Sequence, residues 1–442
     1  MNPSREVIYI HPYTPMLDPL TIPISLPALI KRIPVKVAGY SHKEIGDGQI
    51  KQAKVIIIDI HWHISLLGAA KLVKRIRRLN PQAKIIAGGI TATEYAKLLT
   101  EQLDIDYVIR GDAEKPLPEL VMKLLNGADK IDLVPNLVGK NGFQTPWSYA
   151  LSQKDLDEND FYDLDFFPAL RRRISSFHKR NRGWPVPMHP YIVTYRGCPR
   201  DCSFCAGARK EQYKLFRRQA VIRSPGRLRD DFSVLEKDPE IKFVNVLHDF
   251  ITLLPEAYWR QALAKKINLN IGYYFSLQPA IGAVKLLLCS FRGGLVYFSA
   301  DKKHATTQEL GSPETTAAAI DLVKQAAAYE PLLVYNSFFM KKDKEYNSWV
   351  RYVYNKTKVP LVDVKLWFMI DFPQPASDGY AESKSFDSFM YYDEAAERFK
   401  LTAANYIEKI FAAVDYFAPG PIPIELRKLV IRLLHHTRWT MF

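Results

Sequence analysis

Three of the four cysteines in the chain lie close together, at Cys198, Cys202 and Cys205, in the spacing C-x3-C-x2-C. The segment just before them, residues 191–196, has the pattern of a strand, so the three thiols share the loop that follows it. Thiolates are the ligands of iron–sulfur clusters, and three of them can hold three irons of a cubane while the fourth iron stays open. Because an open iron can bind a substrate, this loop predicts a [4Fe-4S] cluster that takes part in chemistry.

A zinc site is the structural alternative for these cysteines. Zinc normally takes four ligands, with a second pair some distance along the chain. The fourth cysteine, Cys289, lies in the apolar run 286–289, where we expect a buried structural thiol. No histidine near the loop has the spacing of a zinc ligand, so the iron–sulfur interpretation is favoured.

The elements that must position this chemistry begin with an alternation of strand and helix patterns in the N-terminal part of the chain. Residues 55–58 are apolar on both faces, as in a strand buried within a parallel sheet, and residues 66–79 carry apolar side chains at helical spacing. We therefore predict an α/β fold that starts with a doubly wound, Rossmann-like domain over residues 1–130. Its strands are expected at residues 7–10, 35–40, 55–60, 84–87 and 107–110.

Ligands of such a sheet bind at the carboxyl ends of the strands. At one of these ends, Gly88 and Gly89 would let a ligand approach the backbone closely, and Thr91 and Thr93 offer hydroxyl groups there. A tight strand-to-helix turn without a ligand is the competing interpretation.

Residues 131–189 are expected to form a linker, because prolines, glycines, an acidic run and basic clusters replace the regular pattern. A second alternation follows and predicts a (β/α)6 partial TIM barrel over residues 190–375, with its reactive face where the strands end. A small C-terminal region, residues 376–442, ends in an apolar helical stripe. The barrel strands are expected at 191–196, 242–248, 271–276, 294–299, 332–338 and 362–370, and the helices between them at 225–237, 255–266, 280–291, 313–328 and 345–356.

The composition is that of a globular protein, with 442 residues of which 48% are hydrophobic and 24% charged. No apolar stretch approaches the roughly 18 residues that span a bilayer, and the N-terminus lacks a signal-peptide core, so we expect a cytoplasmic protein without a transmembrane segment. The formal net charge of +14 would suit nucleic acid or an anionic membrane. The basic residues are spread along the chain in clusters typical of solvated faces, and a nucleic-acid partner is therefore not expected.

The cysteine loop resembles the signature of the radical S-adenosylmethionine (SAM) enzymes, which combine this spacing with an aromatic residue before the third cysteine. Phe204 takes that place. The resemblance covers the second domain, because these enzymes fold as a (β/α)6 partial barrel with the cluster loop after its first strand. It implies that the open iron chelates SAM and that one electron then cleaves it to a 5′-deoxyadenosyl radical. It also implies an electron donor such as ferredoxin or flavodoxin.

The N-terminal part resembles the cobalamin-binding domain that precedes this barrel in one large branch of the superfamily. Residues 55–65, 85–93 and 106–114 carry the match in their order and spacing. The loop that starts at His11 lacks the D-x-H-x-x-G pattern, which implies that no histidine from this loop ligates cobalt. The cofactor would then be held base-off.

The resemblance also indicates cofactor contacts at the strand ends. His61, Trp62 or His63 is expected to occupy or shield the lower face of the cobalt, although a histidine at a strand end is more often an ordinary hydrogen-bonded residue. In the barrel, polar residues at strand ends stand where the superfamily binds SAM or substrate, and an arginine such as Arg223 could meet the SAM carboxylate. Many members have a glutamate where this chain has Asp301. The expected contacts are His61, Trp62, His63, Ser65, Gly88, Gly89, Thr91, Gly111 and Glu114 for cobalamin, and Phe204, Asp249, Ser299 and Asp301 in the barrel.

The paired domains predict a cobalamin-dependent radical SAM enzyme, most plausibly a methylase that acts on an unactivated carbon. A cyclase or rearrangement enzyme with the same cofactors is the first alternative. A metal-stabilised protein that binds nucleic acid or a membrane is the alternative of another class. The substrate, whether a small molecule, a lipid or a peptide, is not indicated by the sequence.

Overall fold

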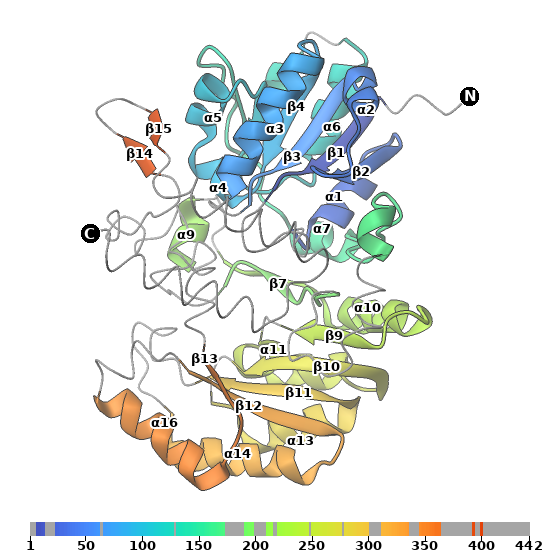
Figure 1. Ribbon diagram of the computed structural model, residues 1–442. Helices are drawn as coiled ribbons and strands as arrows, with labels where there is room; N and C mark the ends of the chain where they lie inside the picture. The colour runs from blue at the N-terminus through green and yellow to red at the C-terminus, as the bar shows by residue number, and fades with distance from the viewer. Residues whose placement is uncertain are drawn as a thin grey trace.

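Two sheets, both mainly parallel, organise the chain, and each has helices packed against it (Figure 1). This architecture confirms the predicted α/β class. The computed structural model describes residues 6–13, 23–61, 65–127, 130–172, 190–198, 209–214, 219–246, 249–275, 278–299, 311–335, 344–363, 391–393 and 398–400.

The first sheet has the strand order β2-β1-β3-β4-β5-β6 and is parallel except at β6. Strand β1 pairs with both β2 and β3. The chain runs from β1 to β2 on one side and then returns to β3 on the other side of β1, so the strand order reverses there. Such a switch point opens a crevice at the carboxyl ends of the two strands, where ligands of doubly wound sheets bind. The strands are β1 (Val7–His11), β2 (Val37–Ser41), β3 (Val55–Asp59), β4 (Lys84–Gly88), β5 (Tyr107–Ile109) and β6 (Leu137–Gly139).

Both faces of this sheet are covered, which explains its continuous apolar strands. All five residues of β1 are buried, with Ile8 and Ile10 in the core on one face and Val7 and Tyr9 in the core on the other. The covering helices are α1 (Leu26–Lys31), α2 (Asp47–Gln52), α3 (Leu66–Leu79), α4 (Ile90–Glu94), α5 (Ala96–Gln102) and α6 (Pro116–Leu125).

The sheet continues into the segment that we predict as a linker. Strand β6 pairs antiparallel with β5 and buries Leu137 and Val138 at the edge of the sheet. Helix α7 (Gln153–Glu158) follows and begins with a capping box between Ser152 and Asp155. The domain boundaries themselves stay predictions.

The second sheet is fully parallel, in the order β13-β12-β11-β10-β9. The predicted first strand, residues 191–196, joins it only through a parallel bridge between Tyr191 and Asn245. Its end, β7 (Tyr195–Arg196), pairs instead with β8 (Val221–Ile222), antiparallel. The sheet strands are β9 (Phe243–Val246), β10 (Ile267–Phe275), β11 (Phe291–Ser299), β12 (Tyr329–Tyr335) and β13 (Leu361–Asp363).

The helices of the second half follow the expected alternation. They are α9 (Arg209–Lys214), α10 (Pro225–Lys237), α11 (Phe250–Leu253), α12 (Glu256–Ala262), α13 (Ile281–Ser290), α14 (Pro313–Gln325) and α16 (Lys344–Thr357). Of the C-terminal region, the described residues form the hairpin β14 (Tyr391–Asp393) and β15 (Arg398–Lys400). The predicted terminal helix lies outside the described residues.

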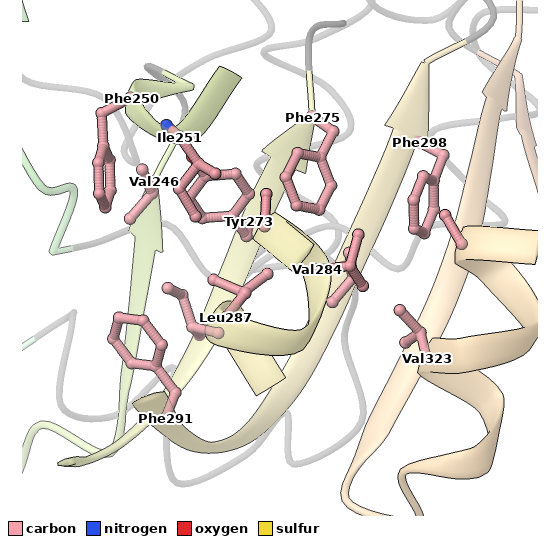
Figure 2. Packing of buried hydrophobic residues seen from close by; sticks show 14 of the residues in the cluster. Val246, Phe250, Ile251, Tyr273, Phe275, Val284, Leu287, Phe291, Phe298 and Val323 are labelled. Carbon is pink, nitrogen blue, oxygen red and sulfur yellow. The ribbon is translucent and has the colours of Figure 1, made fainter. Parts of the chain in front are cut away.

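An aromatic core holds the second sheet to its helices (Figure 2). Tyr273 packs edge-on against Phe250 at 5.7 Å between ring centroids, and Phe275 stacks on Phe298 at 5.6 Å. Helix α13 contributes Val284 and Leu287 to the same core. Edge and offset-stacked ring pairs add stabilisation beyond the apolar area that they bury.

Cys289 corrects an expectation, because its side chain is exposed and not buried. The helix turns Val284 and Leu287 toward the core, which leaves Cys289 on the solvent side. Among the described helices, none combines the length and the apolar character that a bilayer span would need.

Candidate functional site

The switch point between β1 and β3 holds a buried polar cluster of Tyr9, His11 and Asp59. The Tyr9 hydroxyl donates to the Asp59 carboxylate, and His11 Nδ1 lies 2.9 Å from Asp59 Oδ1 and 3.1 Å from the Tyr9 hydroxyl. Since an ionised carboxylate can only accept, His11 donates to it from Nδ1. The cluster ties the ends of the two strands together below the crevice.

Charge in this cluster is balanced against burial. Burial opposes ionisation of Asp59, but His11 and the hydrogen bonds from His11 and Tyr9 outweigh it and hold the pKa of the carboxyl below its ordinary value. Burial and the neighbouring Asp59 raise the pKa of the Tyr9 hydroxyl. At the ends of β1 and β3, Asp59 is therefore anionic and Tyr9 neutral near pH 7.

The end of β4 is a bare backbone edge. Among the described residues, a Cβ added to Gly88 would meet only the Ile109 carbonyl oxygen, at 4.0 Å, so these residues leave the space over Gly88 open. Gly89 has φ +115°, and a Cβ there would lie 2.7 Å from the Ile60 carbonyl oxygen. The first glycine thus leaves room for a ligand, and the second lets the β4 loop pack directly on the β3 loop. An edge of this shape fits the expected cobalamin.

Hydrogen bonds join the β4 turn to its two neighbours. Thr91 Oγ1 donates to the His61 carbonyl oxygen at 3.0 Å, and Thr93 Oγ1 donates to the Gly89 carbonyl oxygen at 2.9 Å. Thr93 Oγ1 also accepts from the Gly111 N–H at 2.9 Å. Both threonine hydroxyls therefore hold loops together in this structure.

After β5, the turn 111–114 presents two buried carboxylates to the second half of the chain. Gly111 begins it with φ +71°, and Asp112 and Glu114 follow with exposed fractions of 4% and 1%. Arg196, at the end of β7, lies with Nη1 3.2 Å from Asp112 Oδ1 and Nη2 2.8 Å from Glu114 Oε1. Burial opposes the charge of Arg196, but Glu114 and Asp112 outweigh it and raise the pKa of the guanidinium.

His61, at the end of β3, lies within electrostatic reach of the same arginine. Burial lowers the pKa of His61 to about 4; Asp59 opposes this effect and Arg196 adds to it. The imidazole is therefore neutral near pH 7, which is the state that a metal ligand or a packing partner requires. Its role toward cobalt stays a prediction.

The cluster loop begins two residues after Arg196. Cys198 is partly exposed, and Gly197 between them has φ +80°. The other predicted site residues of this loop lie outside the described part, as do several elsewhere in the chain. These are Cys202, Phe204 and Cys205, and Trp62, His63 and Asp301.

The barrel residues have varied surroundings. Asp249 is buried and caps α11, accepting from the Thr252 N–H at 3.0 Å and the Tyr273 hydroxyl at 2.9 Å. Ser299 is the last residue of β11, at the carboxyl end of that strand, while Ser65 is buried at the start of α3. Contacts of these residues with cofactors stay predictions.

Arg223 differs from its sequence-based role. It is fully buried and binds Asp231 through Nε and Nη2, and it also donates to the Leu156 and Asn159 carbonyl oxygens. With these bonds its guanidinium joins the segment around α7 to α10, so it is not placed to meet a SAM carboxylate.

Sequence reasoning missed Arg196 and Asp112. Its signal was available: a cation stands next to the cluster loop, and acidic residues stand in a loop at the ligand edge of the first sheet. Opposite charges on two edges that must face a common space favour an ion pair.

Comparisons with known proteins find a matching domain family, two similar enzymes and similar solved structures. Residues 49–121 match the B12-binding domain. An anaerobic magnesium-protoporphyrin IX monomethyl ester cyclase from Rubrivivax gelatinosus is 24% identical over 327 residues, 71% of this chain and 56% of the cyclase. A hopanoid C-3 methylase from Methylococcus capsulatus is 24% identical over 224 residues, 49% of this chain and 39% of the methylase.

Solved structures extend the likeness to the fold. The radical SAM methyltransferase TsrM from Kitasatospora setae, with cobalamin and a [4Fe-4S] cluster bound, superposes with a TM-score of 0.50 at 17% identity, covering 75% of this chain and 66% of TsrM. The chain itself spans little more than half the length of the cyclase and about two fifths of the methylase.

Proposed function

Because the chain has a B12-binding domain and the fold of the cobalamin-dependent radical SAM enzymes, we propose that it methylates an unactivated carbon of a substrate. Cys198, Cys202 and Cys205 would hold the [4Fe-4S] cluster. When bound, the cluster and SAM supply a 5′-deoxyadenosyl radical, and cobalamin supplies the methyl group.

The observation that carries this proposal is the ion pair of Arg196 with Asp112 and Glu114. It joins the residue two positions before Cys198 to the turn at the ligand edge of the first sheet. In Figure 1, β7 lies between the two sheets. This arrangement supports a reaction in which two cofactors act on one substrate in a shared space.

The residues of the chain have separate tasks in this proposal. The backbone at Gly88 would leave room for the corrin, and His61, which is neutral near pH 7, would add no charge beside it. Asp112 and Glu114 neutralise the charge of Arg196, so it would not present an unpaired cation to the substrate. A site closed to water would protect a carbon radical, which would otherwise be quenched.

The test is anaerobic reconstitution of the full chain with iron, sulfide and hydroxocobalamin, followed by reduction and incubation with SAM. We expect four irons and four acid-labile sulfides per chain, bound cobalamin, and formation of 5′-deoxyadenosine. With candidate substrates, a methylase forms S-adenosylhomocysteine as well. Cys198→Ala removes one proposed cluster ligand. Cys289→Ala is its matched control, because it leaves the cysteine loop intact.

Product analysis also separates the alternatives. Turnover of substrate with 5′-deoxyadenosine but without S-adenosylhomocysteine would contradict methylation and favour a cyclase or rearrangement enzyme. The longer match to the magnesium-protoporphyrin IX monomethyl ester cyclase supports that second candidate. Zinc without sulfide, with salt-sensitive binding to nucleic acid or to vesicles, would instead favour a metal-stabilised binding protein.

An electron donor completes the proposal, because reductive cleavage of SAM needs one electron. A flavodoxin or ferredoxin would serve, and the net charge of +14 complements an acidic donor. Chemical reductant should support turnover in the absence of such a protein.

A further inference from the structure

A chain of polar contacts runs from the open backbone at β4 to the cysteine loop of the second half. Thr93, in the helix that follows the glycine pair, bonds to the Gly89 carbonyl oxygen and accepts from the Gly111 N–H, each at 2.9 Å. Gly111 opens the turn that carries Asp112 and Glu114, and these carboxylates hold Arg196. Two steps of this path join different loops: the bond from Gly111 to Thr93, and the ion pairs of Arg196 with the two carboxylates.

Each carboxylate in the path is fixed by a second donor. Asp112 Oδ2 accepts from the Leu151 N–H at 2.8 Å, and Glu114 Oε2 accepts from the Ala113 N–H at 3.1 Å. The Asn159 side-chain amide lies 3.4 Å from Glu114 Oε1. The anionic turn is therefore rigid, and a displacement of it would carry Arg196 along.

Arg196 is anchored at both of its ends. Its backbone pairs with Val221 in β8, and next to it the Arg223 N–H donates to the Thr194 carbonyl oxygen at 2.9 Å. Its guanidinium uses two separate nitrogen atoms for the two carboxylates, with 19% of the side chain exposed. A planar fork holds its two nitrogen atoms at a fixed separation, whereas an ammonium group would have to reach both carboxylates from one nitrogen.

The step from Arg196 to Cys198 is short and stiff. Gly197 has φ +80°, and a Cβ there would lie 3.1 Å from Oε1 of the buried Gln212 in α9. Gly197 therefore packs closely against α9, while the carboxylates hold the side chain of the residue before it.

We propose that Arg196 is a positioning residue that couples the cluster loop to the B12-binding domain, so that each cofactor binds more tightly when the other is present. The inference rests on the proposed function only in assuming that both cofactors bind. The coupling travels along Thr93, Gly111, the two carboxylates and Arg196, and by thermodynamic linkage it acts equally in both directions.

The test compares the affinity of the full chain for hydroxocobalamin before and after anaerobic cluster reconstitution. In the wild-type chain we expect reconstitution to lower the dissociation constant about fivefold or more, within the usual range of coupling between sites. Arg196→Lys keeps the charge but loses the fork, and Glu114→Gln removes one partner. Thr93→Val removes the hydroxyl that accepts from the Gly111 N–H, and so breaks the path at its β4 end. Each should bring the ratio of the two constants to within about twofold of one.

A second readout follows the cluster itself. Hydroxocobalamin should slow the extraction of iron by a chelator in the wild-type chain and have little effect in Arg196→Lys. Arg171→Gln is the matched control, because Arg171 also joins two carboxylates, Asp165 and Asp238, but is half exposed and remote in sequence from the cysteines. It should retain the wild-type ratio.

A triple variant, Asp112→Asn with Glu114→Gln and Arg196→Met, distinguishes loss of folding from loss of coupling. This neutral network leaves no unpaired buried charge. It should bind hydroxocobalamin and cluster without coupling. A wild-type ratio near one, or a ratio that survives in Arg196→Lys, Glu114→Gln and the neutral network, would overturn the inference. Failure of the wild-type chain to bind either cofactor would instead overturn the proposed function.

Discussion

At the scale of single residues, burial decides which groups remain charged. His61 has its pKa lowered to about 4 from an ordinary 6.5, so the unfolded chain takes up its proton more readily than the folded one does. The folded state therefore loses stability from His61 as the pH falls from about 6.5 toward 4, and this contribution is fully present above that window.

The variant His61→Asn tests this assignment on the cofactor-free chain. The free energy of unfolding of the wild type, measured by denaturant titration, should fall more steeply between pH 7 and pH 5 than that of the variant. Equal slopes for the two proteins would mean that His61 is protonated in both states alike.

The adjacent glycines of the β4 turn make a second pair of tests at this scale. Gly89→Ala places a Cβ 2.7 Å from the Ile60 carbonyl oxygen at φ +115°, and we expect it to destabilise the fold by about 1–3 kcal/mol. The methyl group of Gly88→Ala meets no described atom closer than 4.0 Å, so the midpoint of thermal unfolding should stay near that of the wild type.

The affinity for hydroxocobalamin separates these two glycines further. The methyl group of Gly88→Ala would project into the space assigned to the corrin, and the dissociation constant should rise by about tenfold. Unchanged affinity in Gly88→Ala would remove Gly88 from the proposed site.

At the scale of elements, the phase of a helix separates core from surface. Leu287→Ala in α13 removes a fully buried side chain from the aromatic core and should cost about 2–5 kcal/mol of unfolding free energy. Cys289→Ser, two residues away on the exposed side, should change it by less than about 0.5 kcal/mol. Chemical denaturation of both variants tests this phase, which a comparable cost for Cys289→Ser would contradict.

Helices and strands could be predicted from the sequence where their residues show a clear period or a capping signal. Residues 66–79 and 225–237 are predicted with their observed bounds, because α3 has a clear apolar stripe and α10 begins at Ser224-Pro225. The run 286–289 is apolar all round, so it contains no phase and leads to the wrong burial of Cys289. Strand β6 has only three residues among turn-forming neighbours, too few for a period to appear.

In the candidate site, too, the features that could be predicted are those with a local sequence signal. Glycine pairs and cysteine spacing are local, so Gly88, Gly89 and Cys198 could be singled out from the sequence. The carboxylates that bind Arg196 and the carbonyl groups that bind Arg223 lie far away in the sequence. Only the fold shows that one arginine joins the two halves while the other is enclosed with Asp231.

At the scale of the whole molecule, Arg223 holds the segment around α7 to the second sheet. Burial raises the pKa of Asp231 to about 6, although Arg223 opposes this. Arg223→Met should leave the buried Asp231 with only the more distant Arg227, whose Nε lies 3.8 Å from Asp231 Oδ1, and cost about 3–5 kcal/mol, measured by thermal unfolding. Replacing both, as Arg223→Met with Asp231→Leu, should recover part of that loss, and a double variant as unstable as the single one would show that the carbonyl contacts dominate.

The separation of 84 residues between Asp112 and Arg196 has a consequence for synthesis on the ribosome. The first sheet is complete in sequence once Gly139 has emerged, so it can fold while the rest is still being made. At a translation rate of about 5–20 residues per second, its two carboxylates then stay unpaired for about 3–11 seconds before Arg196 leaves the exit tunnel. During that interval the two carboxylates are hydrated anions on a nascent domain. They are neutralised only when Arg196, at the start of the second half, has been synthesised and binds them.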